Sequence, residues 1–210
     1  DRLLAEASRE RAADVDVPVP ASLSATALTR LRDDPDGFAR DLARPMPRPP
    51  SPQARFGTLF HAWVEARFGQ QPLLDPDDLP GRGDLGIDDE ADLDELIERF
   101  ESGPFGDRVP HAVEAGFSLV LAGQVIRGRI DAVYAEERAE GPGYLLVDWK
   151  TNREQTADPL QLAVYRLAWA ELHDLPVERV RAAFCYVRTG VLVEPPDLPG
   201  RDDLEALLRP

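Results

Sequence analysis

The sequence predicts an α/β domain built on a mixed β-sheet, with several helices preceding the sheet. A hairpin pattern covers 113–135, and an apolar strand follows at 143–149. A helical pattern at 160–173 then leads into a further strand at 180–187. This β-β-β-α-β order, placed after a run of helical segments, is typical of α/β architecture.

Length and composition favour one globular domain, or one domain with an appended arm. The chain has 210 residues, of which 43% are hydrophobic and 30% charged, as in ordinary soluble proteins. No apolar run approaches the ~18 residues of a membrane span, and the charged N-terminus lacks a signal-peptide core. The lone Cys185 cannot form an internal disulfide, so we expect a reducing, intracellular location. The formal charge of −15 counts against indiscriminate nucleic-acid binding.

The N-terminal region predicts a short helical arm between two connecting segments. Residues 1–21 are polar and end in VDVPVP, which indicates an extended lead-in or a linker from an upstream region. Two short helices are expected within 23–47, with Ser22 or Ser24 capping the first and DDPDG ending it. The proline-rich segment 45–52 predicts a hinge.

The clearest helical pattern covers 53–68. Its apolar stripe consists of Phe56, Leu59, Phe60, Trp63 and Val64. His61 lies at the margin of this stripe with Glu65 one turn later, where a histidine serves either packing or ligation. A loop at 70–86 and an acidic amphipathic helix at 88–100 follow, and we interpret the acidic run 75–101 as a solvated face.

The later elements place two polar residues on one helix face. Asp158 and Pro159 predict the start of the helix at 160–173, on which Gln161 and Tyr165 share a face. A short strand at 191–194 and a terminal helix at 202–208 complete the chain.

Two aspartates on neighbouring predicted strands carry the functional signal. Asp131 ends GRID and Asp148 lies in YLLVDWK, where Lys150 shares its strand face. A carboxylate in a strand buried on both sides is costly unless a metal, a hydrogen bond or an opposite charge compensates it. Two such carboxylates beside a lysine suggest a hard divalent cation. The alternatives are an in-sheet salt bridge between Asp148 and Lys150 and a turn-capping role for Asp131.

In this order and spacing, GTLFH (57–61), GRID (128–131), VDWKT (147–151) and QLAVY (161–165) resemble motifs of the RecB-type branch of the PD-(D/E)XK nucleases. The resemblance covers roughly residues 22–194. It implies a restriction-endonuclease-like mixed sheet flanked by helices, with the N-terminal helical arm, for a nuclease domain at 22–210.

The resemblance also implies roles for individual residues. The implied metal ligands for Mg²⁺ or Mn²⁺ are His61, Asp131, Asp148 and the backbone carbonyl of Trp149. The implied catalytic set is Asp131, Asp148, Lys150, Gln161 and Tyr165. Glu114 matches a frequent acid of the family and orients a ligand or a water, or else has a structural role.

The implied function is metal-dependent hydrolysis of DNA, on a single strand or an unwound end. In RecB, AddA and AdnAB chains such a domain forms the C-terminal part of a helicase–nuclease that resects DNA breaks, in the bacterial cytoplasm with the nucleoid. No GxxxxGK[ST] motif occurs in the sequence, so the helicase motor is expected elsewhere on the parent chain or on a partner chain. Several relatives hold an iron–sulfur cluster with four cysteines, and Cys185 alone predicts that this cluster is absent.

Three other functions compete with this interpretation. The first is a non-cleaving module that binds a DNA strand as a scaffold for a helicase; degenerate copies lose the aspartates or the lysine, which this sequence keeps. The second is a metal-independent hydrolase with Asp131 and Asp148 as an acid–base pair, which leaves Lys150 unexplained. Nucleophilic catalysis has little support, because Cys185 lies in a predicted strand with no paired histidine.

Overall fold

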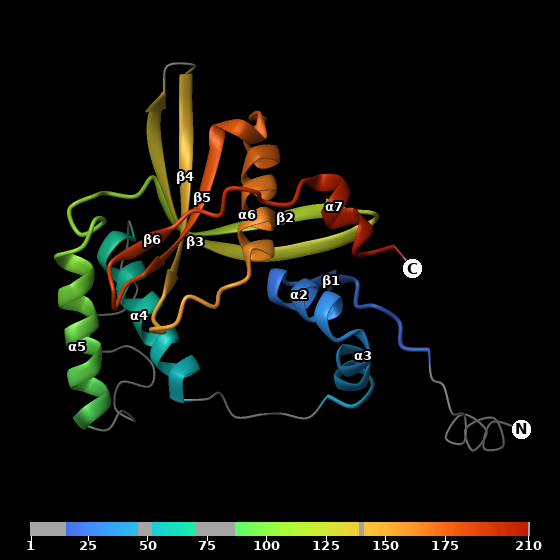
Figure 1. Ribbon diagram of the computed structural model, residues 1–210, viewed down its shortest axis with the longest axis horizontal. Helices are drawn as coiled ribbons and strands as arrows, with labels where there is room; N and C mark the ends of the chain where they lie inside the picture. Colours follow the sequence, from blue (N-terminus) through green and yellow to red (C-terminus); the bar gives the residue numbers. More distant parts are fainter. Residues whose placement is uncertain (1–15, 46–51, 70–86, 139–140, 210) are drawn as a thin grey trace, which may run out of the picture.

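The computed structural model describes residues 16–45, 52–69, 87–138 and 141–209 (Figure 1). The predicted linker up to residue 15, the hinge at 46–51 and the loop at 70–86 lie outside these ranges. No helix within the described ranges combines the length and apolar content needed to cross a membrane.

A mixed sheet forms the centre of the fold, as predicted, and it contains six strands. Its strands are β1 (Ser22–Leu23), β2 (Ala112–Leu121), β3 (Gln124–Arg138), β4 (Gly141–Lys150), β5 (Val180–Tyr186) and β6 (Val191–Val193). β3 pairs antiparallel with β2 on one edge, whereas β4 (antiparallel) and β1 (parallel) share its other edge. β4 then pairs parallel with β5, and β5 pairs antiparallel with β6.

The predicted hairpin is confirmed as β2 and β3. The turn between them contains Ala122 and Gly123, both with positive φ (47° and 80°). Two positive φ values in a two-residue loop match the turn type whose twist suits antiparallel strands.

The N-terminal arm forms α2 (Ala25–Asp33) and α3 (Pro35–Ala43). The side chain of Ser24 accepts a hydrogen bond from the backbone N–H of Ala27, so Ser24 caps α2. Asp34 caps α3, and Pro35 opens it. DDPDG therefore ends one helix and starts the next. The two-residue strand β1 was not predicted.

Helices cover both faces of the sheet, which explains why β4 is apolar on both sides (Figure 1). On one face, α6 (Pro159–Leu172) and α2 pack in the core that contains Leu146 of β4. On the other face, α4 (Pro52–Phe68) and α5 (Ile87–Glu101) pack on Leu145, Val147 and Trp149. A 3₁₀ turn, η3 (Val177–Arg179), precedes β5, and α7 (Arg201–Ala206) ends two residues earlier than predicted.

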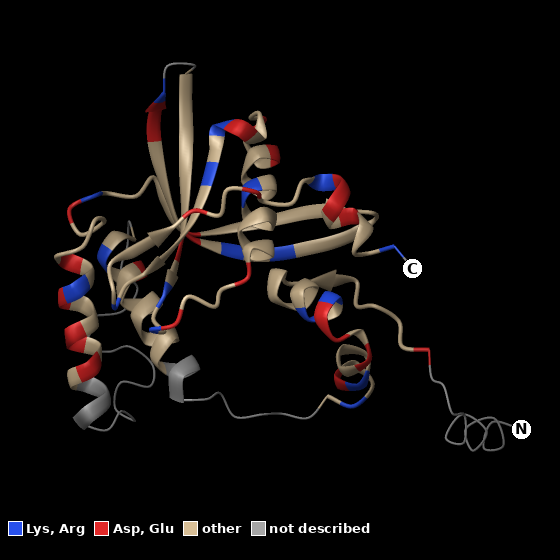
Figure 2. Ribbon diagram, viewed as in Figure 1, with Lys and Arg blue, Asp and Glu red and all other residues tan. Residues whose placement is uncertain are grey.

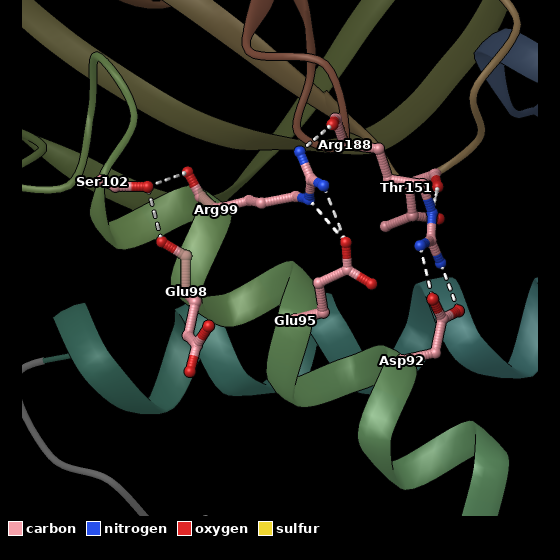
Figure 3. Close-up of polar contacts among 7 residues, drawn as sticks. All are labelled: Asp92, Glu95, Glu98, Arg99, Ser102, Thr151 and Arg188. Atoms are coloured by element: carbon pink, nitrogen blue, oxygen red, sulfur yellow. Dashed lines mark hydrogen bonds and ion pairs between the residues drawn. The ribbon is translucent and has the colours of Figure 1, made fainter.

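Arg188, just after β5, ties α5 to the end of β4. Its guanidinium donates two hydrogen bonds to Asp92 on α5, at 2.6 and 2.5 Å, and a third of 2.7 Å to the backbone carbonyl of Thr151 (Figure 3). Arg99 on α5 donates in turn to the carbonyl of Arg188, at 3.0 Å. The acidic residues Asp94, Glu95, Glu98 and Glu101 of α5 are exposed, as predicted for a solvated face in the described part of the run 75–101 (Figure 2).

Candidate active site

The site lies where β3 and β4 stop pairing. Their register runs from Arg138 and Gly141 to Ala132 and Val147. Just beyond that point, the backbone N–H of Trp149 donates a hydrogen bond of 2.8 Å to Oδ2 of Asp131. The carboxylate of Asp131 therefore bridges the two strands in place of a backbone hydrogen bond.

His61, Glu114 and Asp131 form one cluster around a cleft. Nδ1 of His61, on α4, lies 3.6 Å from Oε1 of Glu114 and 3.6 Å from Oδ2 of Asp131. The cleft encloses about 510 Å³. Its lining consists of Gly57, Thr58, His61, Ala62, Glu65, Glu114, Arg129 and Asp131. The sequence left open whether His61, at the margin of the apolar stripe, serves packing or ligation. In the structure its side chain lines this cleft.

Glu114 reaches the cluster through an unusual backbone conformation. Its φ is +48° near the start of β2, between the ladder pairs Val113–Ala132 and Ala115–Ile130. A non-glycine residue with positive φ inside a strand is strained, and such strain is found preferentially at functional sites.

Asp148 belongs to an adjoining network on the other side of the strand junction. Its Oδ1 accepts a hydrogen bond of 2.8 Å from Gln161 on α6, and its Oδ2 lies 2.5 Å from Nζ of Lys150. Gln161 also donates to the hydroxyl of Tyr165 at 2.8 Å and accepts from Lys150 at 3.0 Å. The predicted shared faces of Asp148 with Lys150 and of Gln161 with Tyr165 are therefore present.

The two aspartates are held in an environment that disfavours their charge. Burial raises the pKa of Asp131 to about 8, and the charge of Asp148 adds to this increase. Asp148 is only 2% exposed, and this burial raises the pKa of its carboxyl group, although the charge of Lys150 opposes the increase. Burial lowers the pKa of His61, but the contact with the carboxylate of Glu114 and the charges of Asp131 and Asp148 outweigh it and raise this pKa to about 9.

His61, Glu114 and Asp131 fit a divalent cation. One ligand atom from each of His61, Glu114 and Asp131 lies within 4.8 Å of the others. Ligands on opposite sides of an ion with bonds of ~2.1–2.4 Å are about 4.2–4.8 Å apart, so the cluster has the right size. Oδ2 of Asp148 is buried and, within the described residues, has the ion pair with Lys150 but no hydrogen bond of good geometry. A cation would compensate these buried carboxylates.

Two further residues bear on the sequence predictions. Nη1 of Arg129 lies 3.9 Å from Oε2 of Glu114 at the rim of the cleft, and the sequence predictions did not include it. Its place within GRID is the signal that could have identified it. Burial raises the pKa of Cys185 to about 12, so this thiol stays protonated at neutral pH, unlike a nucleophilic cysteine.

Comparison with known proteins relates this fold to one enzyme superfamily. A family model described as "PD-(D/E)XK nuclease superfamily" matches residues 22–208. No curated protein sequence matches the chain.

Among solved structures, the chain is similar to a "Putative exonuclease" from Eubacterium rectale. The TM-score is 0.57 and the sequence identity 13%, over 90% of this chain and 76% of that chain. At this identity the likeness shows a common fold, and together with the family match it confirms the restriction-endonuclease-like architecture. SSO0001 matches with a TM-score of 0.38 and 11% identity, over 99% of this chain and 81% of that chain. This second likeness is too weak to support an argument.

Proposed function

Because the chain belongs to the PD-(D/E)XK nuclease superfamily, whose members use divalent metals, we propose that it is a metal-dependent deoxyribonuclease with its active site at the junction of β3 and β4. The observation that carries this proposal is a pair of buried aspartates on adjacent strands: Asp131 lies beside His61, and Asp148 lies beside Lys150. The two carboxylates are close enough that the charge of Asp148 raises the pKa of Asp131. A fold without a cation partner would gain stability from apolar residues at the aspartate positions.

The proposed metal ligands are His61, Glu114, Asp131, Asp148 and the backbone carbonyl of Trp149. Oxygen ligands suit Mg²⁺, whereas a site that also contains an imidazole nitrogen favours Mn²⁺. A divalent cation bound there supplies charge neutralisation for the scissile phosphate and lowers the pKa of a bound water.

The neighbouring side chains position the reacting groups. Lys150 offers its ammonium to the phosphate or to the attacking water while it is held by Gln161. Gln161 fixes Asp148 and Tyr165 in one orientation. Burial raises the pKa of the Tyr165 hydroxyl, which therefore remains a proton donor at neutral pH.

The wider setting that we propose rests on the RecB-type motifs. The domain at 22–210 would form the C-terminal part of a bacterial helicase–nuclease that resects DNA double-strand breaks, with residues 1–21 leading in from an upstream region. Its partners would be a single or unwound DNA strand and the helicase motor domains of the same or another chain. The expected location is the nucleoid region of the cytoplasm.

A cleavage assay on labelled single-stranded DNA tests this proposal. We expect hydrolysis by the purified chain with Mn²⁺ or Mg²⁺, no hydrolysis in EDTA, and a loss of at least ~10²-fold in Asp148→Ala. Cleavage that survives both EDTA and Asp148→Ala would contradict it. DNA binding without any cleavage, with metal present, would favour the non-cleaving scaffold instead.

A further inference from the structure

The β2–β3 hairpin presents an open face that begins at the proposed active site. The outward-pointing residues that follow Glu114 on β2 and precede Asp131 on β3 form a surface that we call the hairpin face. Because strand side chains alternate, this face continues the side of the hairpin on which Glu114 and Asp131 lie. Its cross-strand pairs are Gly116–Arg129, Ser118–Arg127 and Val120–Val125.

The opposite side of the hairpin is closed. Phe117, Leu119, Ile126 and Ile130 are buried in the core that contains α6. A Cβ atom on Gly128 would lie 2.8 Å from the ring of Phe117, so the absence of a side chain there lets the ring pack against the strand. The packing of this side fixes the outward direction of the hairpin face.

The hairpin face is exposed and cationic within an acidic chain. The side chain of Arg129 is 66% exposed, and Arg127 and Ser118 are also exposed. No ion-pair partner of Arg127 occurs in the described ranges, whereas Arg129 has only the distant contact of 3.9 Å with Glu114. The sequence between Ala115 and Ile130 contains these two arginines and no acidic residue, although the net charge is −15 (Figure 2).

The geometry of this face suits a phosphodiester backbone. Two residues apart on one strand, the arginines are separated by about 7 Å along β3. Opposite Arg129, a Cβ atom placed on Gly116 would have no other atom within 4 Å, which leaves room for a close approach. Arg129 also lines the cleft, so a strand bound along the face would enter the cleft beside Asp131.

We propose that the hairpin face binds the sugar–phosphate backbone of one DNA strand and leads that strand to the active site, with Arg127 and Arg129 as its phosphate-binding residues. This inference rests on the proposed nuclease function and adds the path of the substrate. Arginine recognises phosphate through several planar donors, and the hydroxyl of Ser118 supplies one more. Between Arg127 and Asp131, beyond the pairing of β3 with β1, the face is two strands wide, with strands ~4.8 Å apart, and accommodates a single backbone rather than a duplex.

Binding measured by fluorescence anisotropy tests this path, with labelled oligothymidylate and the Asp148→Asn protein in Mg²⁺ to prevent cleavage. We expect Arg127→Ala/Arg129→Ala to weaken binding about tenfold or more at low salt. The slope of log affinity against log salt, between about 50 and 200 mM, should decrease in magnitude by ~1.4, or ~0.7 for each phosphate that is no longer neutralised. Arg127→Lys/Arg129→Lys, which keeps both charges, should recover most of the salt slope.

The matched control is Arg40→Ala/Arg44→Ala, which removes the same charge from exposed positions at the end of α3. The DNA affinity of this control should stay within about twofold of that of the parent, because α3 packs on the core at the closed, α6 side of the hairpin and salt screens its exposed charges. The proposed path would be overturned if Arg127→Ala/Arg129→Ala left the salt slope unchanged. It would also be overturned if the control lost as much DNA affinity as the Arg127/Arg129 variant does. Equally strong competition by duplex DNA would overturn the single-strand assignment. If Asp148→Asn still cleaves DNA, the proposed active site fails, independently of the arginine result.

Discussion

The backbone N–H of Trp149 donates a hydrogen bond of 2.8 Å to Oδ2 of Asp131, immediately beyond the last paired residues of β3 and β4. The strand that carries Asp148 therefore orients the carboxylate of Asp131 directly. This bond links the local geometry of the sheet to the proposed chemistry.

Stability without metal should depend on pH through Asp131 and His61. The folded pKa of Asp131 is about 8, above its ordinary value of 3.8, and that of His61 is about 9, above 6.5. Both groups bind protons more tightly in the folded chain, so they stabilise it at low pH and lose this effect as pH rises. In EDTA, the melting temperature should fall between about pH 5 and pH 9.

In Asp131→Asn, the melting temperature in EDTA should fall less steeply with pH, because the substitution removes the carboxyl group with the raised pKa. Mn²⁺ should protect the native protein most at high pH, where its ligands are deprotonated. A melting temperature in EDTA that increases over this pH range, or an unchanged slope in Asp131→Asn, would show that these groups are not coupled to folding as described.

Lys150→Ala should reduce DNA cleavage by about 10²-fold or more while Mn²⁺ still binds. The ammonium lies 2.5 Å from Asp148 and is the cation placed to meet the phosphate or the water. Isothermal titration with Mn²⁺ and single-turnover cleavage separate the two effects. Cleavage at the native rate would remove Lys150 from the mechanism, and loss of Mn²⁺ binding would reassign it to support of the metal site.

Gln161 should act as a positioning residue, because it contacts Asp148, Lys150 and Tyr165 at once. Gln161→Glu replaces the amide donor with a carboxylate next to buried Asp148, so it should impair cleavage more than Gln161→Ala does. Single-turnover rates over a range of pH provide the measurement. The matched control is Gln124→Ala, which removes a hydrogen bond to Pro20 at the other end of β3 and should leave the rate unchanged. Equal rates for Gln161→Glu and the native protein would contradict this role.

Arg188→Ala should destabilise the chain by about 1–3 kcal/mol, because it leaves Asp92 and the carbonyl of Thr151 without their shared donor (Figure 3). The expected cost is modest because the side chain of Asp92 is 40% exposed. Urea denaturation measures the change. Glu95→Ala, which removes an exposed helix-surface ion pair with Arg99 and keeps the hydrogen bonds between Arg188 and Asp92, should cost less than about 0.5 kcal/mol. Equal costs for the two variants would argue against a docking role for Arg188.

Much of the fold was predictable because its signals are local. The apolar run of β4, the turn at Ala122–Gly123 and the Asp158 cap each depend on residues close in sequence. The pairing of β1 with Val125 and Ile126 depends on a contact between segments about a hundred residues apart. A strand of two residues has no periodicity of its own, so the sequence offered no signal for it.

The site was predictable in its strand residues and less so elsewhere. Asp148 and Lys150 follow from strand alternation, and Gln161 and Tyr165 follow from helical spacing. The place of Glu114 depends on a positive φ, which no local preference of glutamate predicts. His61 required knowledge of how α4 packs on the sheet, which its position at the edge of an apolar stripe left open.

The most direct test of the central claim is the anomalous scattering of Mn²⁺ in crystals of this chain soaked at neutral pH. We predict one strong peak in the cleft, within about 2.0–2.4 Å of a ring nitrogen of His61 and of carboxylate oxygens of both Asp131 and Asp148. A peak bound elsewhere, or a cleft without manganese while Asp131 and Asp148 point away from each other, would contradict it.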